Sequence, residues 1–495
     1  MSLPQFLREY FPYCSIPVQG LTSLTADSRK VTPGGLFAAL PGTQDNGVSY
    51  IPQAIAAGAA MILIAQEDYA KLEQIEQLSG LNVQFLRTGD PRLVFAKMAA
   101  AFYEKRPKTC VAVTGTNGKS SVVDFTRQLW TLLGYQSASI GTLGVKGPML
   151  QVCKGLTTPD PAELHTQLAQ LATEYRVTHC ALEASSHGLD QRRLDGLRFQ
   201  AAAFTQFTQD HLDYHVTMEA YFQAKKYLFE ELTDPKGTYV LNADVPEFSV
   251  LSSMATKRNL RVLDYGEKAR ALVLHCLVPD KKGQQMQVEI LGRQEQWFFP
   301  LIGQFQAYNF LCTLGLVLAS GTKAETLLNI FSKHRELPIQ GVAGRLECVA
   351  QSEKTVYVDY AHTPDALAHV LSTIRAHTSG RILIVFGCGG NRDCPKRPLM
   401  GQVAERFGDY VFITDDNPRD EDPAKIRQDM RAGMKGCVPV VEIADRYEAI
   451  ARAITEATSD DVVLIAGKGH EKTQLVRGVA HSFSDQAVVK EILRI

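Results

Sequence analysis

The chain has 495 residues, of which 45% are hydrophobic and 21% are charged, and its formal net charge is -1. This balance excludes the strongly basic composition of proteins whose main partner is a nucleic acid or an anionic membrane surface. The length suggests roughly three domains of ordinary size.

No apolar stretch approaches the roughly 18 residues that a spanning helix needs. Residues 1–8 also lack the basic and apolar pattern of a secretory leader, so we expect a cytoplasmic protein without membrane insertion. Ten cysteines, from Cys14 to Cys437, include no Cys-x-x-Cys pair. This pattern favours reduced, mostly buried thiols over a disulfide framework or a zinc site.

The first segment mixes a strand-like run at 35–40 with an alanine-rich helix near 53–60, and it ends at the charged break 104–107. A second segment continues through alternating strand and helix signals to Leu337 and Pro338. These breaks predict three domains, at 1–106, 107–337 and 338–495.

The second segment opens with a glycine loop, Thr114 to Ser120, between the apolar run 110–113 and a helical pattern that reaches Gly134. A strand, a glycine loop and a helix in succession form a phosphate cradle, in which Lys119 reaches phosphate oxygens and the Ser120 hydroxyl binds Mg2+. The loop is shorter than the usual spacing, because Val113 stands where the first glycine would be. The context predicts nucleoside triphosphate binding, and the alternative is an ordinary glycine turn.

Two further strand-like runs end in polar groups. The run 178–181 leads to Glu183, and the run 204–207 leads to Asp210 and His211. A carboxylate and an imidazole from separate strand ends suit a Mg2+ site that bridges phosphate oxygens. Each residue alone also fits an ordinary loop acid or a capping histidine.

The next helix carries a lysine within an apolar stripe. Lys225 lies seven residues after Met218, whereas Lys226 lies outside the stripe, which consists of Met218, Tyr221, Phe222, Leu228, Phe229 and Leu232. A lysine that points inward loses solvation, so its neutral amine becomes available for chemistry. The alternative is that Lys225 extends along the helix to the surface.

The last segment repeats apolar, β-branched runs at 355–359, 381–386, 410–414 and 461–466, which predicts a doubly wound α/β sheet. Polar loops follow the last three runs, at 389–393, 415–419 and 467–471. In such sheets ligands bind beyond the carboxyl ends of the strands. The two arginines in these loops, with acidic residues opposite them, suit a ligand that carries both carboxylate and ammonium groups. The alternative is that these loops only expose charged side chains to solvent.

Taken together, these motifs resemble the Mur ligase family over essentially the full chain. Residues 114–120 are similar to its T-G-T-N-G-K-[ST] loop, 183–189 to its E-x-S-S-H-G-L element, 210–213 to its D-H-x-D element, and 221–225 to its Y-x-x-A-K stretch. The resemblance implies an α/β fold of three domains. These are an N-terminal uridine-diphosphate-binding domain, a central P-loop-type ATPase domain and a C-terminal Rossmann-like, doubly wound domain.

The resemblance also implies site residues in the central domain. Lys119, His211 and Lys225 would be catalytic. Two Mg2+ ions would be held, one by Ser120 and Glu183 and one by Glu183, His211 and a CO2-derived carbamate on Lys225. The ATP-binding residues would be Gly115, Thr116, Asn117, Gly118, Lys119, Ser120, Asn309, Arg345 and Asp359. Gln306 departs from the family pattern, which has Asn at that position.

For the other two substrates, the implied residues fall in all three segments. The UDP-N-acetylmuramoyl-dipeptide would contact Ser28, Thr157, Thr158, Ser185, Gln191 and Arg193. The incoming amino acid would contact Arg392, Asp416, Asn417, Pro418, Arg419, Gly467 and Glu471. The Asp-Asn-Pro-Arg segment resembles that of diaminopimelate-adding members, and a second carboxylate on the amino acid calls for an extra guanidinium.

The function that the resemblance implies is an ATP-dependent ligase of peptidoglycan precursor synthesis. It would add meso-diaminopimelate to UDP-N-acetylmuramoyl-L-alanyl-D-glutamate through an acyl phosphate. The alternatives are an L-lysine-adding member, a folylpolyglutamate synthetase-like ligase and a non-catalytic nucleotide-binding protein. We expect small-molecule substrates, no nucleic-acid partner and a monomer.

Overall fold

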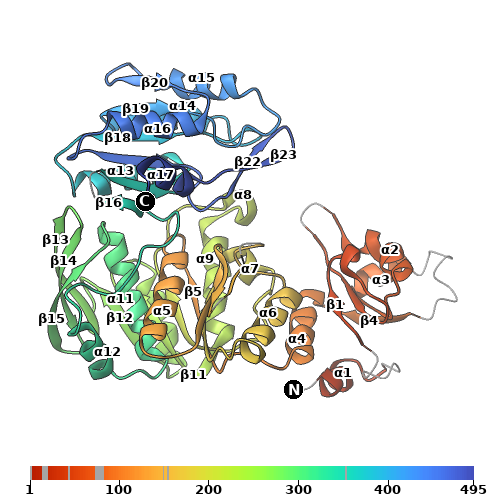
Figure 1. Ribbon diagram of the computed structural model, residues 1–495. Helices are drawn as coiled ribbons and strands as arrows, with labels where there is room; N and C mark the ends of the chain where they lie inside the picture. Colours follow the sequence, from red (N-terminus) through yellow and green to blue (C-terminus); the bar gives the residue numbers. More distant parts are fainter. Residues whose placement is uncertain are drawn as a thin grey trace. The chain divides into compact units, whose positions relative to one another are not determined.

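A computed structural model describes residues 3–13, 21–42, 45–72, 83–148, 150–152, 155–351 and 354–495. The chain forms two compact units (Figure 1). The first contains Met1–Tyr265 and Cys312–Lys323, and the second contains Gly266–Leu311 and Ala324–Ile495.

The first unit begins with a small α/β layer around a four-stranded parallel sheet in the order β1-β2-β3-β4. Its strands are β1 (Leu24–Thr25), β2 (Leu36–Ala39), β3 (Met61–Ala65) and β4 (Gln84–Thr88). Its helices are α1 (Leu3–Tyr10), α2 (Ile51–Ala56), α3 (Gln66–Leu72) and α4 (Pro91–Phe102). Alternate strand residues face α1 and α4 on one side and α2 on the other, so both faces are covered.

A larger sheet follows, in the order β12-β11-β10-β5-β9-β6-β7-β8, with β12 to β6 parallel and β7 and β8 antiparallel. Its strands are β5 (Thr109–Thr114), β6 (Ser137–Gly141), β7 (Gly144–Gly147), β8 (Leu150–Val152), β9 (His179–Glu183), β10 (Phe199–Phe204), β11 (Thr233–Asn242) and β12 (Arg261–Gly266). Its helices are α5 (Lys119–Leu132), α6 (Pro161–Thr173), α7 (Ser186–Asp190), α8 (Leu212–His215), α9 (Met218–Tyr227), the π-helical turn η5 (Leu228–Leu232) and α10 (Phe248–Lys257). Since β5, β9 and β10 are parallel neighbours, the loops that follow them open at the same edge.

The second unit contains an antiparallel meander and a six-stranded sheet. The meander consists of β13 (Leu272–Asp280), β14 (Gly283–Ile290) and β15 (Arg293–Phe299). The sheet has the order β16-β17-β21-β18-β19-β20 and is parallel except for β16 at its edge. Its strands are β16 (Glu347–Gln351), β17 (Thr355–Asp359), β18 (Ile382–Phe386), β19 (Tyr410–Ile413), β20 (Val440–Glu442) and β21 (Val462–Ala466), and β22 (Thr473–Val476) and β23 (Val479–Ser482) form a separate hairpin.

Helices cover both faces of this sheet, as the apolar strand pattern predicted. One core packs Ile384 and Leu464 against α13 to α15, and the other packs Val385 and Ile465 against α16 and α17. The helices are α11 (Gln304–Ala319), α12 (Ala324–Phe331), α13 (Pro364–Arg375), α14 (Lys396–Phe407), α15 (Pro423–Ala432), α16 (Arg446–Glu456) and α17 (Asp485–Leu493). The doubly wound arrangement is confirmed.

Three local predictions differ from the structure in their details. The run 204–207 is not a strand, because β10 covers Phe199–Phe204 and the chain then turns into a loop. The helix expected near 53–60 runs from Ile51 to Ala56. Of the eight cysteines that the structure describes, four are buried, one is half-buried and three are exposed, so the thiols are not mostly buried.

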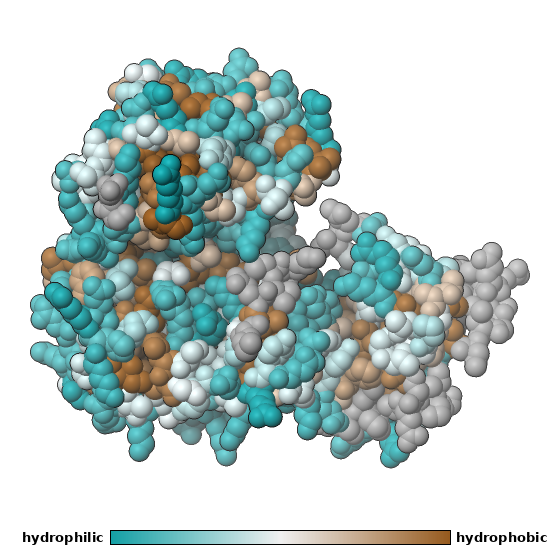
Figure 2. Space-filling model, viewed as in Figure 1, coloured by the Kyte–Doolittle hydropathy of each residue, from teal (hydrophilic) through white to brown (hydrophobic). Residues whose placement is uncertain are grey.

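Polar residues cover most of the face in Figure 2, and apolar residues form separate patches on it. Among the described residues, no helix has both the length and the apolarity to cross a bilayer.

Candidate active site

The phosphate loop connects β5 to α5. Gly115 and Gly118 have φ angles of 141° and 89°, which favour glycine, and Gly118 is the residue at the start of α5. A Cβ atom on Gly115 would lie 1.9 Å from the Thr205 hydroxyl oxygen. Glycine is therefore required for the close approach of the loop to the segment after β10.

Hydrogen bonds hold the loop against that segment. The Thr205 hydroxyl donates to the carbonyl oxygen of Asn117 at 2.6 Å, and the Thr116 hydroxyl bonds both backbone groups of Thr208 at 3.0 and 3.1 Å. The Lys119 amine donates to the carbonyl oxygens of Gly115 and Thr116 at 3.0 and 2.9 Å. Lys119 therefore lies directly over the loop, and Ser120 is buried in the first turn of α5.

Lys225 points inward and does not reach the surface. Its side chain is 1% exposed, its Nζ donates to the carbonyl oxygen of Gly115 at 2.8 Å, and it lies 4.3 Å from the centre of the Tyr221 ring. Burial, with a smaller contribution from the Lys119 ammonium, lowers the pKa of Lys225 well below its ordinary value. The buried interpretation of Lys225 is confirmed, and its amine is inclined toward the neutral form.

The helix that carries Lys225 changes its hydrogen-bonding pattern directly afterwards. The first part, α9, ends at Tyr227, and Leu228–Leu232 form a π-helical turn. Phe222, Leu228 and Phe229 belong to the buried hydrophobic core that also contains residues of β5, β9 and β10. Buried residues therefore precede and follow Lys225 along this helix.

Glu183 ends β9, beside the end of β5, and is buried. The Thr142 amide donates to its Oε1 at 2.9 Å and the Thr142 hydroxyl donates to its Oε2 at 3.1 Å. A Cβ on Gly141 would lie 2.1 Å from Glu183 Oε1, so glycine allows the carboxylate to approach the backbone. Thr142 was not identified from the sequence, because it lies 41 residues from Glu183 in a loop without a recognisable pattern.

His211 lies in a cluster of aromatic and imidazole rings. It has a φ angle of 52° at the start of α8, and its side chain is 44% exposed. Its ring centre lies 4.7 Å from that of His187 and 6.1 Å from that of Tyr221. His211 therefore lies beside Tyr221. Tyr221 precedes Lys225 by four residues in α9.

Carboxylate and hydroxyl oxygen atoms fit Mg2+, which binds to proteins through one or two carboxylates and completes its shell with water and phosphate oxygens. The Glu183 carboxylate at the end of β9 and the Ser120 hydroxyl in the first turn of α5 are donors of this type. Within the part of the chain that the structure describes, no three His, Cys, Asp or Glu side chains form a dedicated metal cluster.

A hydrogen-bonded group at the start of α7 contains four of the residues expected to contact the muramoyl substrate. The Thr158 hydroxyl donates to the Glu183 carbonyl oxygen at 2.8 Å and lies 3.0 Å from the Ser185 hydroxyl. Arg193 donates to the Thr158 carbonyl oxygen at 2.8 Å and to Gln191 at 2.7 Å. The structure thus brings Thr158, Ser185, Gln191 and Arg193 together beside Glu183.

Two other expected residues have different surroundings. The Thr157 hydroxyl lies 3.0 Å from that of Thr142, which connects it to Glu183. Ser28, in contrast, donates to Gln53 at 2.9 Å within the N-terminal layer.

Three expected nucleotide contacts lie in the second unit. Asn309 donates to Gln306 at 3.1 Å, and Gln306 donates to the carbonyl oxygen of Arg345 at 3.4 Å. Asp359 accepts the backbone N–H groups of Leu346 and Ala361. Burial raises the pKa of Asp359, and the Arg345 guanidinium opposes that shift. Gln306, which replaces a family Asn, therefore connects Asn309 to the Arg345 loop.

The polar loops of the second unit meet at the carboxyl edge of its sheet. Asn417 donates to Glu471 at 2.9 Å, and Arg419 donates to the Gly390 carbonyl oxygen at 2.7 Å. A Cβ on Gly389 would lie 2.8 Å from Arg419 Nη1 and 3.8 Å from Arg392 Cγ, so both arginines adjoin this glycine. The loops after β18, β19 and β21 therefore converge, as the sheet topology predicted.

The rest of the expected set completes this edge. A Cβ on Gly467, whose φ is 111°, would lie 2.7 Å from Asp416 Oδ2. Pro418 is buried, and its carbonyl oxygen would lie 1.9 Å from a Cβ on Gly390. The sequence did not single out Lys468, which lies fully buried among Asp416, Asn417 and Glu471.

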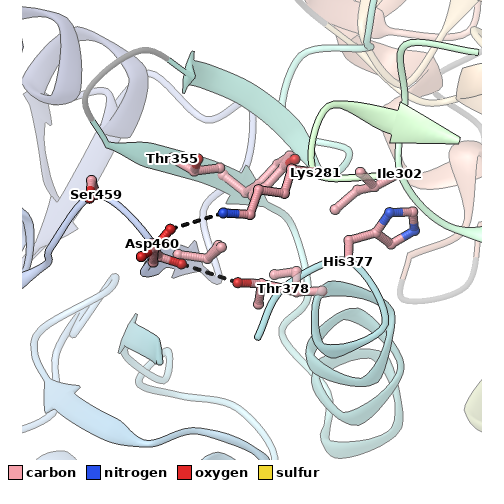
Figure 3. A pocket seen from close by; sticks show the side chains of 10 residues that line it. Lys281, Ile302, Thr355, His377, Thr378, Ser459 and Asp460 are labelled. Carbon is pink, nitrogen blue, oxygen red and sulfur yellow. Dashed lines mark hydrogen bonds and ion pairs between the residues drawn. The ribbon is translucent and has the colours of Figure 1, made fainter. Parts of the chain in front are cut away.

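A pocket in the second unit lies at the opposite edge of the six-stranded sheet (Figure 3). Thr355 and Val462, which begin β17 and β21, line it, and the ion pair between Lys281 and Asp460, 2.9 Å long, spans it. Ligands of doubly wound sheets bind at the carboxyl ends of the strands, and this pocket is at the amino ends. We therefore place the candidate site at the loops and not in this pocket.

Comparison with known proteins agrees with the geometry. Three family models match the chain: "Mur ligase family, catalytic domain" at residues 21–103, "Mur ligase middle domain" at 113–317 and "Mur ligase, glutamate ligase domain" at 344–469. The chain belongs to the Mur ligase family. Its α/β fold of three domains is thereby confirmed, whereas the boundaries at 106 and 337 stay predictions.

Named relatives of this Mur ligase share most of its length. The UDP-N-acetylmuramoyl-L-alanyl-D-glutamate–2,6-diaminopimelate ligase of Caulobacter vibrioides is 46% identical over 490 residues, 97% of each chain. A solved structure with the same enzyme name is 31% identical, has a TM-score of 0.70, and covers 99% of this chain and 98% of its own. The Mycobacterium tuberculosis folylpolyglutamate synthase complexed with ADP covers 76% of this chain and 92% of its own, with a TM-score of 0.61. At 18% identity, that last similarity shows the fold alone.

Proposed function

We propose that this Mur ligase adds meso-diaminopimelate to UDP-N-acetylmuramoyl-L-alanyl-D-glutamate, with ATP as the energy source. The observation that carries the proposal is 46% identity, over 97% of both chains, to a relative named for this reaction. The Asp-Asn-Pro-Arg segment at 416–419 supports the choice of amino acid, because Arg419 and Arg392 adjoin one glycine and can hold a distal carboxylate.

The first step would form an acyl phosphate. A side-chain carboxylate oxygen of the D-glutamyl residue attacks the γ-phosphorus of ATP, the bond to the β-phosphate oxygen breaks, and ADP leaves. The group at Thr158, Ser185 and Arg193 would hold the nucleotide dipeptide beside Glu183. Lys119 and the N–H groups of the phosphate loop would stabilise the charge that develops on the transferred phosphoryl group.

The second step would form the amide. The amine of diaminopimelate attacks the acyl carbon, the carbon–oxygen bond to phosphate breaks, and the nitrogen releases a proton. Glu471 would pair with an ammonium group of the amino acid, and the two arginines would hold its carboxylate. Because three substrates must meet, positioning supplies much of the acceleration.

We also propose that Ser120, Glu183 and His211 hold Mg2+, which offsets phosphate charge when bound. A neutral, buried amine reacts with CO2, so Lys225 would carry a carbamate that adds an anionic oxygen ligand. The reaction would take place in the cytoplasm, where nucleotide substrates are present, with the enzyme as a monomer.

The function is tested with purified protein, ATP, Mg2+ and the nucleotide dipeptide, to which either meso-diaminopimelate or L-lysine is added. We expect ADP release and tripeptide formation with meso-diaminopimelate and little with L-lysine. Preference for L-lysine would refute the proposed amino acid, and absence of ADP release with either would refute the ligase function.

A further inference from the structure

Lys468 is a fully buried cation in the loop after β21. Its side chain is 0% exposed, and its Nζ lies 3.2 Å from Asn417 Oδ1, 3.1 Å from Glu471 Oε2 and 3.8 Å from Asp416 Oδ1. A buried ammonium is costly unless oxygen atoms surround it. Three different side chains of the amino-acid loops meet this requirement, so Lys468 joins the loop after β19 to the loop after β21.

This arrangement fixes the orientation of Asn417. The Leu475 backbone N–H, at 2.9 Å, and the Lys468 ammonium both approach its Oδ1, and both groups can only donate. The amide nitrogen must therefore face the other way, where it donates to Glu471 Oε2 at 2.9 Å. Asn417 acts within the protein, as a link between the lysine, the β22 strand and Glu471.

Glu471 is held through one of its two oxygens. Lys468 and Asn417 both donate to Oε2, while the side chain remains 32% exposed. A carboxylate fixed in this way keeps its Oε1 side available to a ligand that approaches from the exposed direction.

We propose that Lys468 is a positioning residue of the amino-acid site: it orients Glu471 and Asn417 so that one carboxylate oxygen faces the ammonium group of a diamino acid. This inference rests on the proposed function. Lys468 contacts no substrate itself, and its effect passes through Glu471. The positioned carboxylate selects for an amino acid with a second amino group near its distal carboxylate.

The test compares Lys468→Met with Lys472→Met, a matched control at an exposed lysine of the same loop. For Lys468→Met we expect the KM for meso-diaminopimelate to rise roughly tenfold or more, since Glu471 loses its charge-assisted contact with Lys468 and with it its orientation. The KM values for ATP and for the nucleotide dipeptide should stay unchanged, and Lys472→Met should match the wild type in all three.

A second readout separates positioning from simple structural support. In Lys468→Met the rise in the KM for meso-diaminopimelate should come with a kcat close to that of the wild type at saturating substrate, because Glu471 and Asn417 lose the contact that orients them while the phosphate loop is unchanged. A structural defect alone would lower kcat and change the KM values of all three substrates.

If Lys468→Met does not fold, Lys468→Gln carries the same test, because it keeps an N–H donor and removes the charge. Unchanged KM for meso-diaminopimelate, or equal rises for all three substrates, in whichever variant folds would overturn the inference. Absence of ligase activity in the wild type would instead refute the proposed function, so the two failures are distinguishable.

Discussion

Replacing Lys225 with Met should abolish activity while leaving the fold stable. The two side chains are both long and unbranched, and Lys225 is 1% exposed, so Met fills nearly the same volume. The substitution removes one hydrogen bond to the Gly115 carbonyl oxygen, worth about 1 kcal/mol. That oxygen still accepts a bond from Lys119, and the cost of burying an amine disappears. We therefore expect the free energy of unfolding to change by no more than about 1 kcal/mol, in either direction.

Activity should fall far more than stability. Loss of an anionic oxygen ligand at the phosphoryl-transfer site should reduce kcat by roughly 100-fold or more, in the range found when one electrostatic contact is removed from an active site. The assay is ADP release with the nucleotide dipeptide and meso-diaminopimelate. Lys226→Met is the matched control, because Lys226 lies next in sequence and pairs with Glu230 at 2.7 Å outside the loop. It should retain activity within about twofold.

The chemistry of Lys225 gives an independent readout. Only a neutral amine attacks CO2, so carbamate formation should decline as the pH falls through the lowered pKa of Lys225 and the amine becomes protonated. Wild-type enzyme depleted of CO2 should regain activity with bicarbonate, and Lys225→Ala should regain part of it with short carboxylic acids. Wild-type activity in Lys225→Met would refute the reasoning and leave Lys225 as a packing residue.

Three other predictions test separate parts of the molecule. Gly188→Ala would place a Cβ 2.6 Å from that of Thr158, so the KM for the nucleotide dipeptide should rise while the KM for ATP does not; equal rises would count against that site. Arg419→Ala should raise the KM for the amino acid roughly tenfold or more while the KM for ATP changes little. Equal changes in both KM values in the same kinetic assay would place Arg419 outside the amino-acid site. Burial lowers the pKa of His165 to about 3 from 6.5, so the unfolded chain binds a proton that the native chain does not, and stability falls as the pH drops through this window. His165→Leu should flatten that dependence in denaturant titrations at about pH 4 and about pH 7, and an unchanged slope would contradict it.

The strands that could be predicted are those with strong β-branched runs. Thr355–Asp359 forms β17 over the predicted residues, and Val462–Ala466 lacks only the first residue of its predicted run. The strand β10, Phe199–Phe204, was missed because three consecutive alanines at its centre give no strand signal. Alanine fits there because neighbouring parallel strands and the helices leave little space, which is a property of the folded sheet.

The helix containing Lys225 shows a second limit. Its apolar spacing predicted the buried lysine correctly, but the same spacing could not predict the π-helical turn at Leu228–Leu232. One extra residue in a turn shifts the later side chains and leaves the apolar composition unchanged. The turn packs against β11, which follows it directly, and against β10, which ends at Phe204 well before it in the sequence.

For the site, the sequence predicted which loops meet but not which side chains turn inward. Strand order places the loops after β18, β19 and β21 at one edge, and glycine and charged residues identify them. Lys468 and Lys472 are four residues apart in one such loop, and only the first is buried. That difference depends on Asn417, 51 residues from Lys468, and so on tertiary contacts that local composition does not contain.

In each of the two units, the chain's own groups set the direction of a carboxylate before any substrate binds. Thr142 fixes both oxygens of Glu183, and Lys468 with Asn417 fixes one oxygen of Glu471. The difference has a chemical consequence. A carboxylate held at both oxygens is fixed in direction, whereas one held at a single oxygen can still turn its other oxygen toward an ammonium group. Under the proposed function, Glu183 would therefore serve the transfer of the phosphoryl group and Glu471 the choice of the amine.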